Sequence, residues 1–150
     1  MKTVSFEDLP KLVGQDMGTS EWVTIDQDRI NKFADATGDH QWIHVDVERA
    51  KKEMPGGKTI AHGYLTLSLV PMLGAQILRV TGVSRGINYG SNKIRFTNMV
   101  PVGSRVRARQ KLLQVEPKAG GLQMTNEMTI EIEGQERPAC IAETISLVYK

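Results

Sequence analysis

Hydrophobic residues recur at helical spacing in the first half of the chain and at alternate positions in the second half. Apolar residues between positions 30 and 34 mark one face of a helix. A capping-box pattern places the N-cap of this helix at Thr24, with Gln27 three residues further on. Gly38 is its predicted end, because glycine readily takes the left-handed conformation found at helix C-termini.

Two more helices are predicted before the strands begin. The first is short and spans residues 48–54, with Asp46 as its cap and a Pro-Gly-Gly sequence at its end. The second begins near His62 and runs toward residues 81–82. Its apolar residues cover most of its circumference, which predicts a buried helix. Pro71 should bend this helix because proline has no backbone N–H to donate.

The alternating pattern of the second half predicts half-buried antiparallel strands. Residues 105–111 alternate basic with other side chains, and residues 122–133 alternate apolar with polar ones. A turn within residues 116–121 would join these two strands into a hairpin.

Two other strands complete the predicted sheet. The strand at residues 84–96 changes phase near Gly90, which indicates a bulge. The strand at residues 139–149 is apolar on both faces and should therefore be central. A buried helix followed by a long antiparallel sheet predicts an α+β hotdog fold, in which a curved sheet wraps a central helix.

Composition and charge narrow the class of protein. The 150 residues suit a single domain, 1–150, and 40% hydrophobic with 24% charged residues is ordinary for a globular chain. The net charge of +2 is too small to indicate a nucleic-acid partner. Polar residues and a proline interrupt the most apolar stretch, residues 64–80, so we expect no membrane span. One cysteine, Cys140, and no visible signal peptide favour the cytoplasm.

Candidate acid–base chemistry lies directly after the first predicted helix. Asp39 and His44 are five residues apart, so on one helix they would point about 140° away from each other. If Gly38 ends the helix, the following loop can bring both side chains to one point. A carboxylate and an imidazole that share a water can take a proton from it and deliver a proton to carbon. Each such group typically contributes ~10²–10⁴-fold in rate, and the chemistry is that needed to hydrate an alkene.

Gly63 is the second candidate, at the start of the long predicted helix. Its backbone N–H would point out of the helix N-terminus, where the helix dipole is positive. A thioester carbonyl polarised there would stabilise the enolate that forms when water adds, and one such donor is commonly worth ~10²–10³-fold.

These segments resemble a known family. Residues 37–44 resemble the hydratase-2 motif of the MaoC-like (R)-specific enoyl-CoA hydratases, and residues 61–65 resemble the second motif of that family. Residues 88–96 and 100–103 resemble its following strand and turn. The residues of these motifs are most similar to those of the nodulation-protein-N-like subgroup. The resemblance runs from Thr24 to the C-terminus.

The resemblance implies a function and an assembly. It makes Asp39 and His44 a water-activating dyad and Gly63 the oxyanion donor. The implied reaction is syn addition of water to a trans-2-enoyl-CoA, which gives an (R)-3-hydroxyacyl-CoA. The acyl-CoA is the small-molecule partner, and no metal or other cofactor is implied. Members are usually hotdog homodimers that bind substrate near the interface.

Four residues beside the motifs are candidates for binding substrate. Gln41-Trp42 stands where the family pattern usually has Asn-Pro. Gln41 can still form hydrogen bonds, whereas Trp42 could either line the acyl pocket or only fill the loop. His62 is a further candidate, although a structural role in holding the loop before the helix is favoured for it. Tyr64 follows the proposed oxyanion donor and completes the set.

Basic residues offer two possible sites for the phosphates of coenzyme A. One comprises Lys93 and Arg95. The other is the alternating basic row of the predicted hairpin, but glutamates on the facing strand could pair with it, so a charge-paired sheet face is favoured. This basic row consists of Arg105, Arg107, Arg109 and Lys111. A metal site built from the three histidines is disfavoured, because the break at Gly38 separates His40 from His44 and no cysteine is near.

Two other functions stay open. A hotdog thioesterase would direct water to the carbonyl instead of the β-carbon, and analysis of the products would distinguish it. A non-catalytic module that binds acyl thioesters would bind them tightly without turnover. The presence of Asp39, His44 and Gly63 together favours the hydratase.

Overall fold

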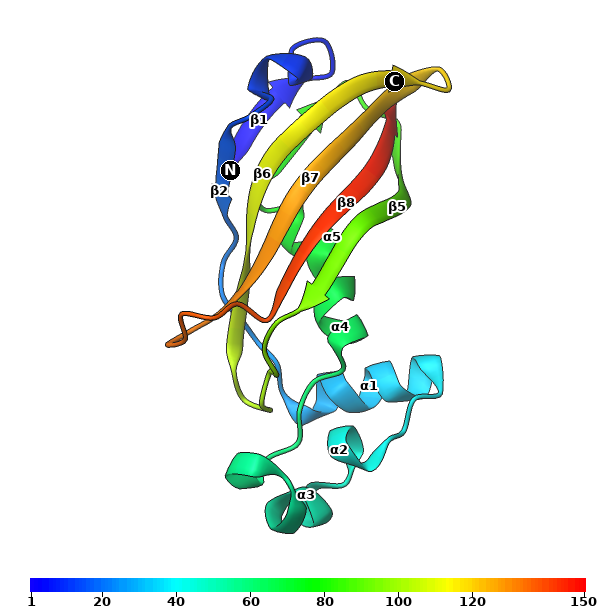
Figure 1. Ribbon diagram of the computed structural model, residues 1–150. Helices are drawn as coiled ribbons and strands as arrows, with labels where there is room; N and C mark the ends of the chain where they lie inside the picture. The colour runs from blue at the N-terminus through cyan, green and yellow to red at the C-terminus, as the bar shows by residue number, and fades with distance from the viewer.

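A curved antiparallel sheet dominates the computed structural model, which describes residues 1–150 (Figure 1). Its main path runs in the order β2-β6-β7-β8-β5, and β3 pairs separately with β6. The strands are β2 (Asp16–Thr19), β3 (Val23–Thr24), β5 (Arg85–Phe96), β6 (Arg105–Lys118), β7 (Gly121–Ile132) and β8 (Cys140–Tyr149).

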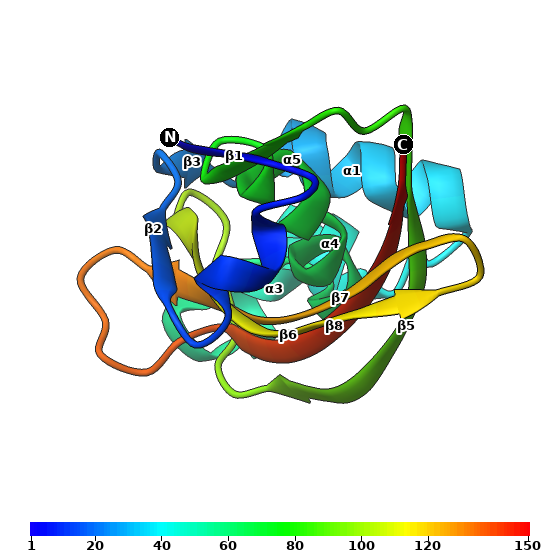
Figure 2. The same cartoon turned by 90° about the horizontal axis from the view of Figure 1, so that it is seen from above.

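The helices fall into two groups. Helices α4 (Gly63–Ser68) and α5 (Val70–Gly74) lie within the curve of the sheet, as the view from above shows (Figure 2). Helices α1 (Gln27–Thr37), α2 (Trp42–Val45) and α3 (Val47–Glu53) cluster beyond one end of it (Figure 1). No helix is both long enough and apolar enough to cross a membrane. Two single 3-10 turns, η1 (Leu9–Leu12) and η2 (Pro55–Gly57), complete the set.

The main core lies between α4–α5 and the concave face of the sheet. Leu65, Leu69 and Leu73 project from the helical side and are almost fully buried. Alternate residues of β6, β7 and β8 meet them from the sheet, including Ala108, Leu112, Met128, Ile130 and Ala142. This arrangement confirms the predicted α+β hotdog fold.

The predicted single helix that runs toward residues 81–82 is wrong in its second half. Helix α4 ends before Leu69, α5 carries Pro71 at its start, and the helical conformation stops at Gly74. Proline cannot donate to the preceding turn, which explains the break. The residues that follow form strand β4 (Leu78–Thr81), which pairs in parallel with β1 (Lys2–Ser5) as a separate two-stranded sheet.

Burial of the central helices is also less complete than predicted. Met72 and Tyr64 are exposed, and Leu67 and Val70 are only half-buried. One curved sheet covers only part of the circumference of α4–α5, which leaves these residues exposed or half-buried.

The start of α1 differs from its prediction, whereas its end agrees. The N-cap is Asp26, whose carboxylate accepts a hydrogen bond from the backbone N–H of Arg29 at 2.9 Å. Thr24 instead belongs to β3, where it pairs with Arg105. Gly38 ends α1 with a φ of +82°, as predicted.

Asp46 caps α3 as predicted, by accepting from the Arg49 N–H at 3.0 Å.

The predicted strands are confirmed, with a tighter turn than expected. Strands β6 and β7 stay paired as far as Lys118 and Gly121. Only Ala119 and Gly120 form the turn, with φ values of +51° and +83°. A two-residue turn with positive φ at both positions matches the twist of the hairpin strands, so pairing continues to the tip.

The last two strands also behave as predicted. The β5–β8 register shifts between Asn88 and Gly90, which confirms the bulge, and shifts again between Ser91 and Lys93. Strand β8 lies between β7 and β5 and is therefore central. Cys140 at its start is fully buried, and burial raises the pKa of its thiol to about 11, so the thiol stays protonated.

Candidate active site

The loop between α1 and α2 presents Asp39 to solvent. Thr37 Oγ1 accepts a hydrogen bond from the Asp39 N–H at 3.4 Å, and the Asp39 carboxylate accepts one from the Gln41 N–H at 3.3 Å. These two local bonds reverse the chain just after Gly38. Helix α2 then begins at Trp42 and carries His44 back toward Asp39.

His44 is buried and held in one orientation. It is 7% exposed, and its Nδ1–H donates to the backbone carbonyl of Ile60 at 2.7 Å. That bond fixes the tautomer and leaves Nε2 as an acceptor. Burial lowers the pKa of His44, and the bond to Ile60 only partly opposes this effect. The ring is therefore neutral near pH 7 and can accept a proton.

His62 connects the start of α4 to the Asp39 loop. It is 2% exposed, and its Nε2–H donates to the backbone carbonyl of Asp39 at 3.0 Å. Its ring stacks on that of His44 with the centroids 3.8 Å apart, and it also contacts Phe33. Its Nδ1 is the one fully enclosed side-chain polar atom without a hydrogen-bond partner. These contacts favour the structural role predicted for His62.

The three side chains converge on one point. One ligand atom from each of Asp39, His44 and His62 lies within 4.8 Å of the other two, so this group could hold a metal ion or a water. The three histidines do not gather as a set. His40 points elsewhere, and its Nε2 lies 2.9 Å from the exposed carboxylate of Asp35.

A cavity of about 360 Å³ opens beside His44. Gly63, the first residue of α4, lines it, and its N–H has no partner within the helix because it is in the first turn. A Cβ at Gly63 would lie 3.2 Å from the ring of Phe96. Glycine therefore allows the ring to approach this backbone closely. Other lining residues include Thr66, Asn98, Met99, Val100 and Arg137.

The other predicted binding residues do not line this cavity. Tyr64 is 68% exposed, and its ring meets Phe96 edge-on with the centroids 5.9 Å apart. Trp42 lies beneath the Arg49 guanidinium, which sits 4.0 Å from the ring centroid. Gln41, Lys93 and Arg95 are exposed at the surface. Their roles in binding substrate stay predictions.

Arg137 is a cavity residue that the sequence reasoning missed. It lies in the connection between β7 and β8, lines the cavity and forms no ion pair. Asn98 holds this connection in place by donating to the Arg137 carbonyl at 3.2 Å and to Gln135 at 2.6 Å. A lone arginine in a loop has no periodic pattern, so the sequence carries no signal that sets it apart.

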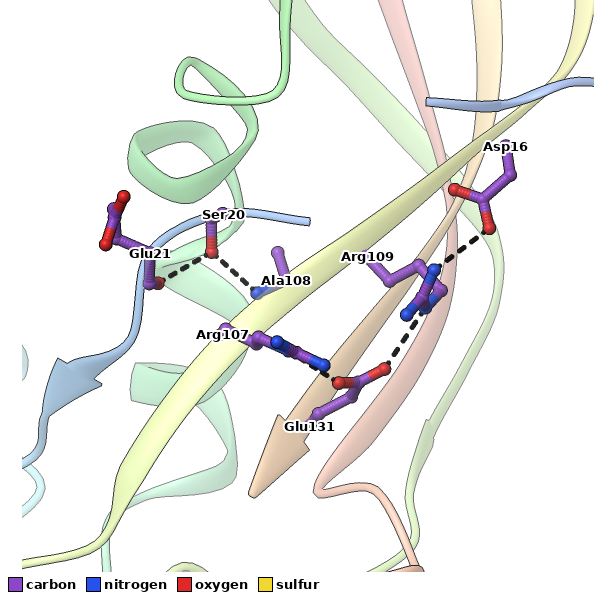
Figure 3. A network of polar contacts seen from close by, with 7 residues as sticks. All are labelled: Asp16, Ser20, Glu21, Arg107, Ala108, Arg109 and Glu131. Carbon is purple, nitrogen blue, oxygen red and sulfur yellow. Dashed lines mark hydrogen bonds and ion pairs between the residues drawn. The ribbon is translucent and has the colours of Figure 1, made fainter. Parts of the chain in front are cut away.

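Three of the four residues of the basic row on β6 are paired with carboxylates, as favoured, whereas Lys111 forms no ion pair; Figure 3 shows Arg107 and Arg109. Arg107 and Arg109 both donate to Glu131 on β7, at 2.7 and 3.2 Å, and Arg109 also reaches Asp16. Partial burial would raise the pKa of Glu131, but these two hydrogen bonds outweigh it and hold the pKa below its usual range. Arg105 pairs with Glu133 at 3.0 Å.

A carboxylate and an imidazole that meet beside a cavity at the start of the central helix of a hotdog sheet form the arrangement expected of a hydratase or dehydratase. The chain belongs to the MaoC-like dehydratase family, because residues 8–133 match the model of the MaoC like domain. The predicted family is thereby confirmed.

Named relatives agree with this assignment. The 3-hydroxyacyl-thioester dehydratase Z of Mycobacterium tuberculosis is 55% identical over 142 residues, which cover 94% of this chain and 93% of that protein. Nodulation protein N of Rhizobium leguminosarum bv. viciae is 44% identical over 150 residues, covering 99% and 93%. The (R)-hydratase from A. caviae involved in PHA biosynthesis has the same fold, with a TM-score of 0.72, 24% identity, and coverage of 89% and 94%.

Proposed function

We propose that this chain adds water across the double bond of a trans-2-enoyl thioester to give an (R)-3-hydroxyacyl thioester, or catalyses the reverse dehydration. One observation carries the proposal: His44 has a free Nε2, a lowered pKa and the Asp39 carboxylate within reach, all beside a cavity. The name of the mycobacterial relative, a 3-hydroxyacyl-thioester dehydratase, supports the substrate class.

The proposed chemistry follows from the positions of three groups. Asp39 and His44 hold one water between them. Its oxygen forms a bond to the β-carbon while one of the two groups accepts its proton, and that same proton is then delivered to the α-carbon, so both groups end as they began. The double bond is consumed, and addition from one side is syn. The developing enolate oxygen lies against the Gly63 N–H, which offers an unpaired donor at the cavity wall.

We assign the coenzyme A phosphates to Arg137 in preference to the basic row. Arg137 is at the cavity and free of carboxylates, whereas Arg107 and Arg109 already share Glu131. Lys93 and Arg95 stay secondary candidates.

We further propose a homodimer through β5. This strand is the edge of the sheet and exposes Ile87 and Tyr89, and an open edge with apolar side chains favours pairing with a second copy. A cytoplasmic location remains part of the proposal.

The thioesterase alternative uses the same water but attacks the carbonyl carbon and releases free coenzyme A. The binding-module alternative predicts no turnover. The free acceptor on His44 and the N–H of Gly63 favour an acid–base reaction over binding alone, and the family is one of dehydratases.

The deciding experiment follows hydration of crotonyl-CoA and of a longer trans-2-enoyl-CoA by loss of enoyl absorbance. Chiral analysis identifies the product, and a thiol reagent detects free coenzyme A. We expect the (R)-3-hydroxyacyl-CoA, no free thiol, and the same rate after dialysis against a chelator, because no metal or cofactor is part of the proposal. Release of coenzyme A would establish the thioesterase. Tight binding with an intact double bond would establish the binding module.

A further inference from the structure

A second and larger hollow lies inside the curve of the sheet. Its volume is about 1070 Å³, and residues of α4–α5 and of strands β5 to β8 line it. Figure 2 shows this helix pair inside the curve of those strands. It continues along the elements that bound the catalytic cavity. On α4, Gly63 and Thr66 face the smaller cavity and Leu67 faces the larger. On β5, Phe96 faces the smaller and Ile94 the larger. The two cavities therefore border the same helix and the same strand, one after the other.

A row of polar side chains crosses the sheet on the floor of this hollow. Asn126 on β7 lies directly opposite Thr144 on β8, and Thr144 lies opposite Ser91 on β5. Residues that face each other across antiparallel strands point to the same side of the sheet. Gln110 on β6 extends the row by donating from Nε2 to Asn126 Oδ1 at 2.9 Å. All four residues line the hollow.

The row has hydrogen-bonding capacity that the protein does not use. Gln110 and Asn126 are only 5% and 6% exposed, and their mutual bond leaves Gln110 Oε1 and Asn126 Nδ2 without partners. Neither atom is fully enclosed, because only His62 Nδ1 is both enclosed and unpaired. Both atoms therefore keep access to the hollow. Unpaired polar groups among apolar walls cost stability unless a ligand or water satisfies them.

We propose that the hollow holds the acyl chain and that Gln110, Asn126, Thr144 and Ser91 bind a hydroxyl group carried on that chain far from the thioester. The inference rests on the proposed function and names its substrate class. A hydroxyl matches the two free atoms, because it can donate to Gln110 Oε1 and accept from Asn126 Nδ2. A few polar groups that converge within an apolar cavity are typical of a specific ligand site.

The distance between Gly63 and the polar row determines where on the acyl chain the hydroxyl must be. A Cβ at Gly74 would lie 4.0 Å from Gln110 Oε1, so the row is level with the end of α5. Gly63 and Gly74 are eleven residues apart along two nearly continuous helices. At a rise of 1.5 Å per residue the separation is ~16 Å. This distance is too long for the hydroxyl formed at the β-carbon to reach the row. The row therefore binds a different hydroxyl, on the distal part of a long chain.

The test compares long trans-2-enoyl-CoA substrates of equal length, one unsubstituted and the others with a hydroxyl stepped along the distal half of the chain. We expect one hydroxyl position to raise the wild-type kcat/KM about 10- to 100-fold over the plain chain, since two new hydrogen bonds form. The double variant Gln110→Met/Asn126→Leu should lose this preference, so the ratio of its kcat/KM values for the hydroxylated and the plain chain should fall to about one. Replacing both partners of their mutual bond leaves neither one unsatisfied.

Two further variants keep the test decisive. Gln114 lies on the same strand as Gln110 but is exposed and outside the hollow. The variant Gln114→Met should therefore retain the preference. If the double variant does not fold, Thr144→Val removes one hydroxyl of the row with little change of shape, and it should lose part of the preference.

Each contrary result overturns the inference. Wild type could show no preference at any position, or the double variant could keep the full preference. A change in the oligomeric state of the double variant with an unchanged preference would show that a second copy fills the hollow. If no substrate is hydrated, the proposed function fails. Calorimetric measurement of the binding of saturated acyl-CoAs, with and without the hydroxyl, then tests hydroxyl binding by the row separately. Tighter binding of the hydroxylated chain supports the inference, and equal binding overturns it.

Discussion

Two regions of this molecule concentrate ionisable side chains, but they use them in opposite ways. On the outer face of β6 and β7, Arg107 and Arg109 find a shared carboxylate in Glu131. At the helical end, His44 is held by a backbone carbonyl, and the Asp39 carboxylate has no ion-pair partner. On this sheet face, the three arginines of the basic row all have carboxylate partners within the protein. The helical end keeps an acceptor and a carboxylate free beside a cavity, so unused hydrogen-bonding capacity indicates function better than charge density does.

The strongest test of this difference between the two regions is to remove the Asp39 carboxylate and the His44 imidazole. Asp39→Asn and His44→Ala should each lower kcat/KM for enoyl-CoA hydration by ~10²–10⁴-fold, because each removes one partner in proton transfer. The double variant should be little worse than the poorer single one, since the two groups act on one water. The matched control is His40→Ala, whose ring pairs only with exposed Asp35. Loss of activity in this control, or full activity in folded His44→Ala, would refute the assignment.

The next effect concerns the backbone donor. Gly63→Ala places a methyl group 3.2 Å from the Phe96 ring, so either the ring or the start of α4 must shift. A small displacement of a positioned group can cost ~10²-fold, and we expect a loss of that order in kcat/KM. Phe96→Ala should recover part of the activity when combined with Gly63→Ala, because it removes the ring atoms that crowd the added methyl group. A Gly63→Ala variant with wild-type kinetics would show that the reaction does not depend on the close contact between this backbone and Phe96.

Local chemistry in the sequence predicted several of these features correctly. Gly38 ends α1 and Asp46 caps α3, because each needs only its own neighbours. The loop after Gly38 does bring Asp39 toward His44, as expected from a helix that ends there. The prediction for the start of α1 was wrong because Thr24 and Asp26 are both good N-cap residues. Thr24 pairs with another strand and belongs to β3, so Asp26 caps the helix.

Features that depend on distant contacts could not be predicted. Leu78–Thr81 has enough apolar residues for a helix, but its pairing with Lys2–Ser5 decides its conformation. The bond from His62 to the Asp39 carbonyl joins residues 23 positions apart, and no local pattern encodes it. Arg137 lines the cavity from a loop whose backbone is bonded to Asn98, 39 positions earlier in the chain. In each case the deciding partner lies far along the chain.

A third effect is the dependence on pH. Burial holds the pKa of His44 below its usual 6.5, so the ring stays neutral until the pH falls below that value. We expect kcat/KM to fall about tenfold per pH unit on the acid side, with its midpoint below 6.5. Below pH 6.5 the unfolded chain binds a proton at this residue that the folded chain resists. The free energy of unfolding should therefore also decrease as the pH falls below 6.5, and less so in His44→Ala. A midpoint above 6.5 would contradict the buried, neutral ring.

A smaller effect is expected at His62. His62→Phe keeps a ring against His44 but removes the donor to the Asp39 carbonyl, so the loop loses one restraint. We expect kcat to fall several-fold with little change in KM, because Asp39 is misplaced while the substrate cavity is intact. His62→Gln, whose amide can donate to the same carbonyl, should recover part of kcat. A merely structural role would lower the melting temperature without this split between kcat and KM.

The smallest expected effect lies on the sheet face. Arg107→Met removes one of the two donors to Glu131, and the remaining bond from Arg109 keeps that carboxylate paired. We expect kcat/KM to stay within about twofold and the free energy of unfolding to fall by ~0.5–1 kcal/mol, as for other partly exposed ion pairs. Arg137→Met should show the reverse: a raised KM for the coenzyme A ester, and unchanged stability in a denaturant titration. If Arg107→Met raises KM as much as Arg137→Met does, the paired row also binds substrate, and charge pairing no longer separates the two regions.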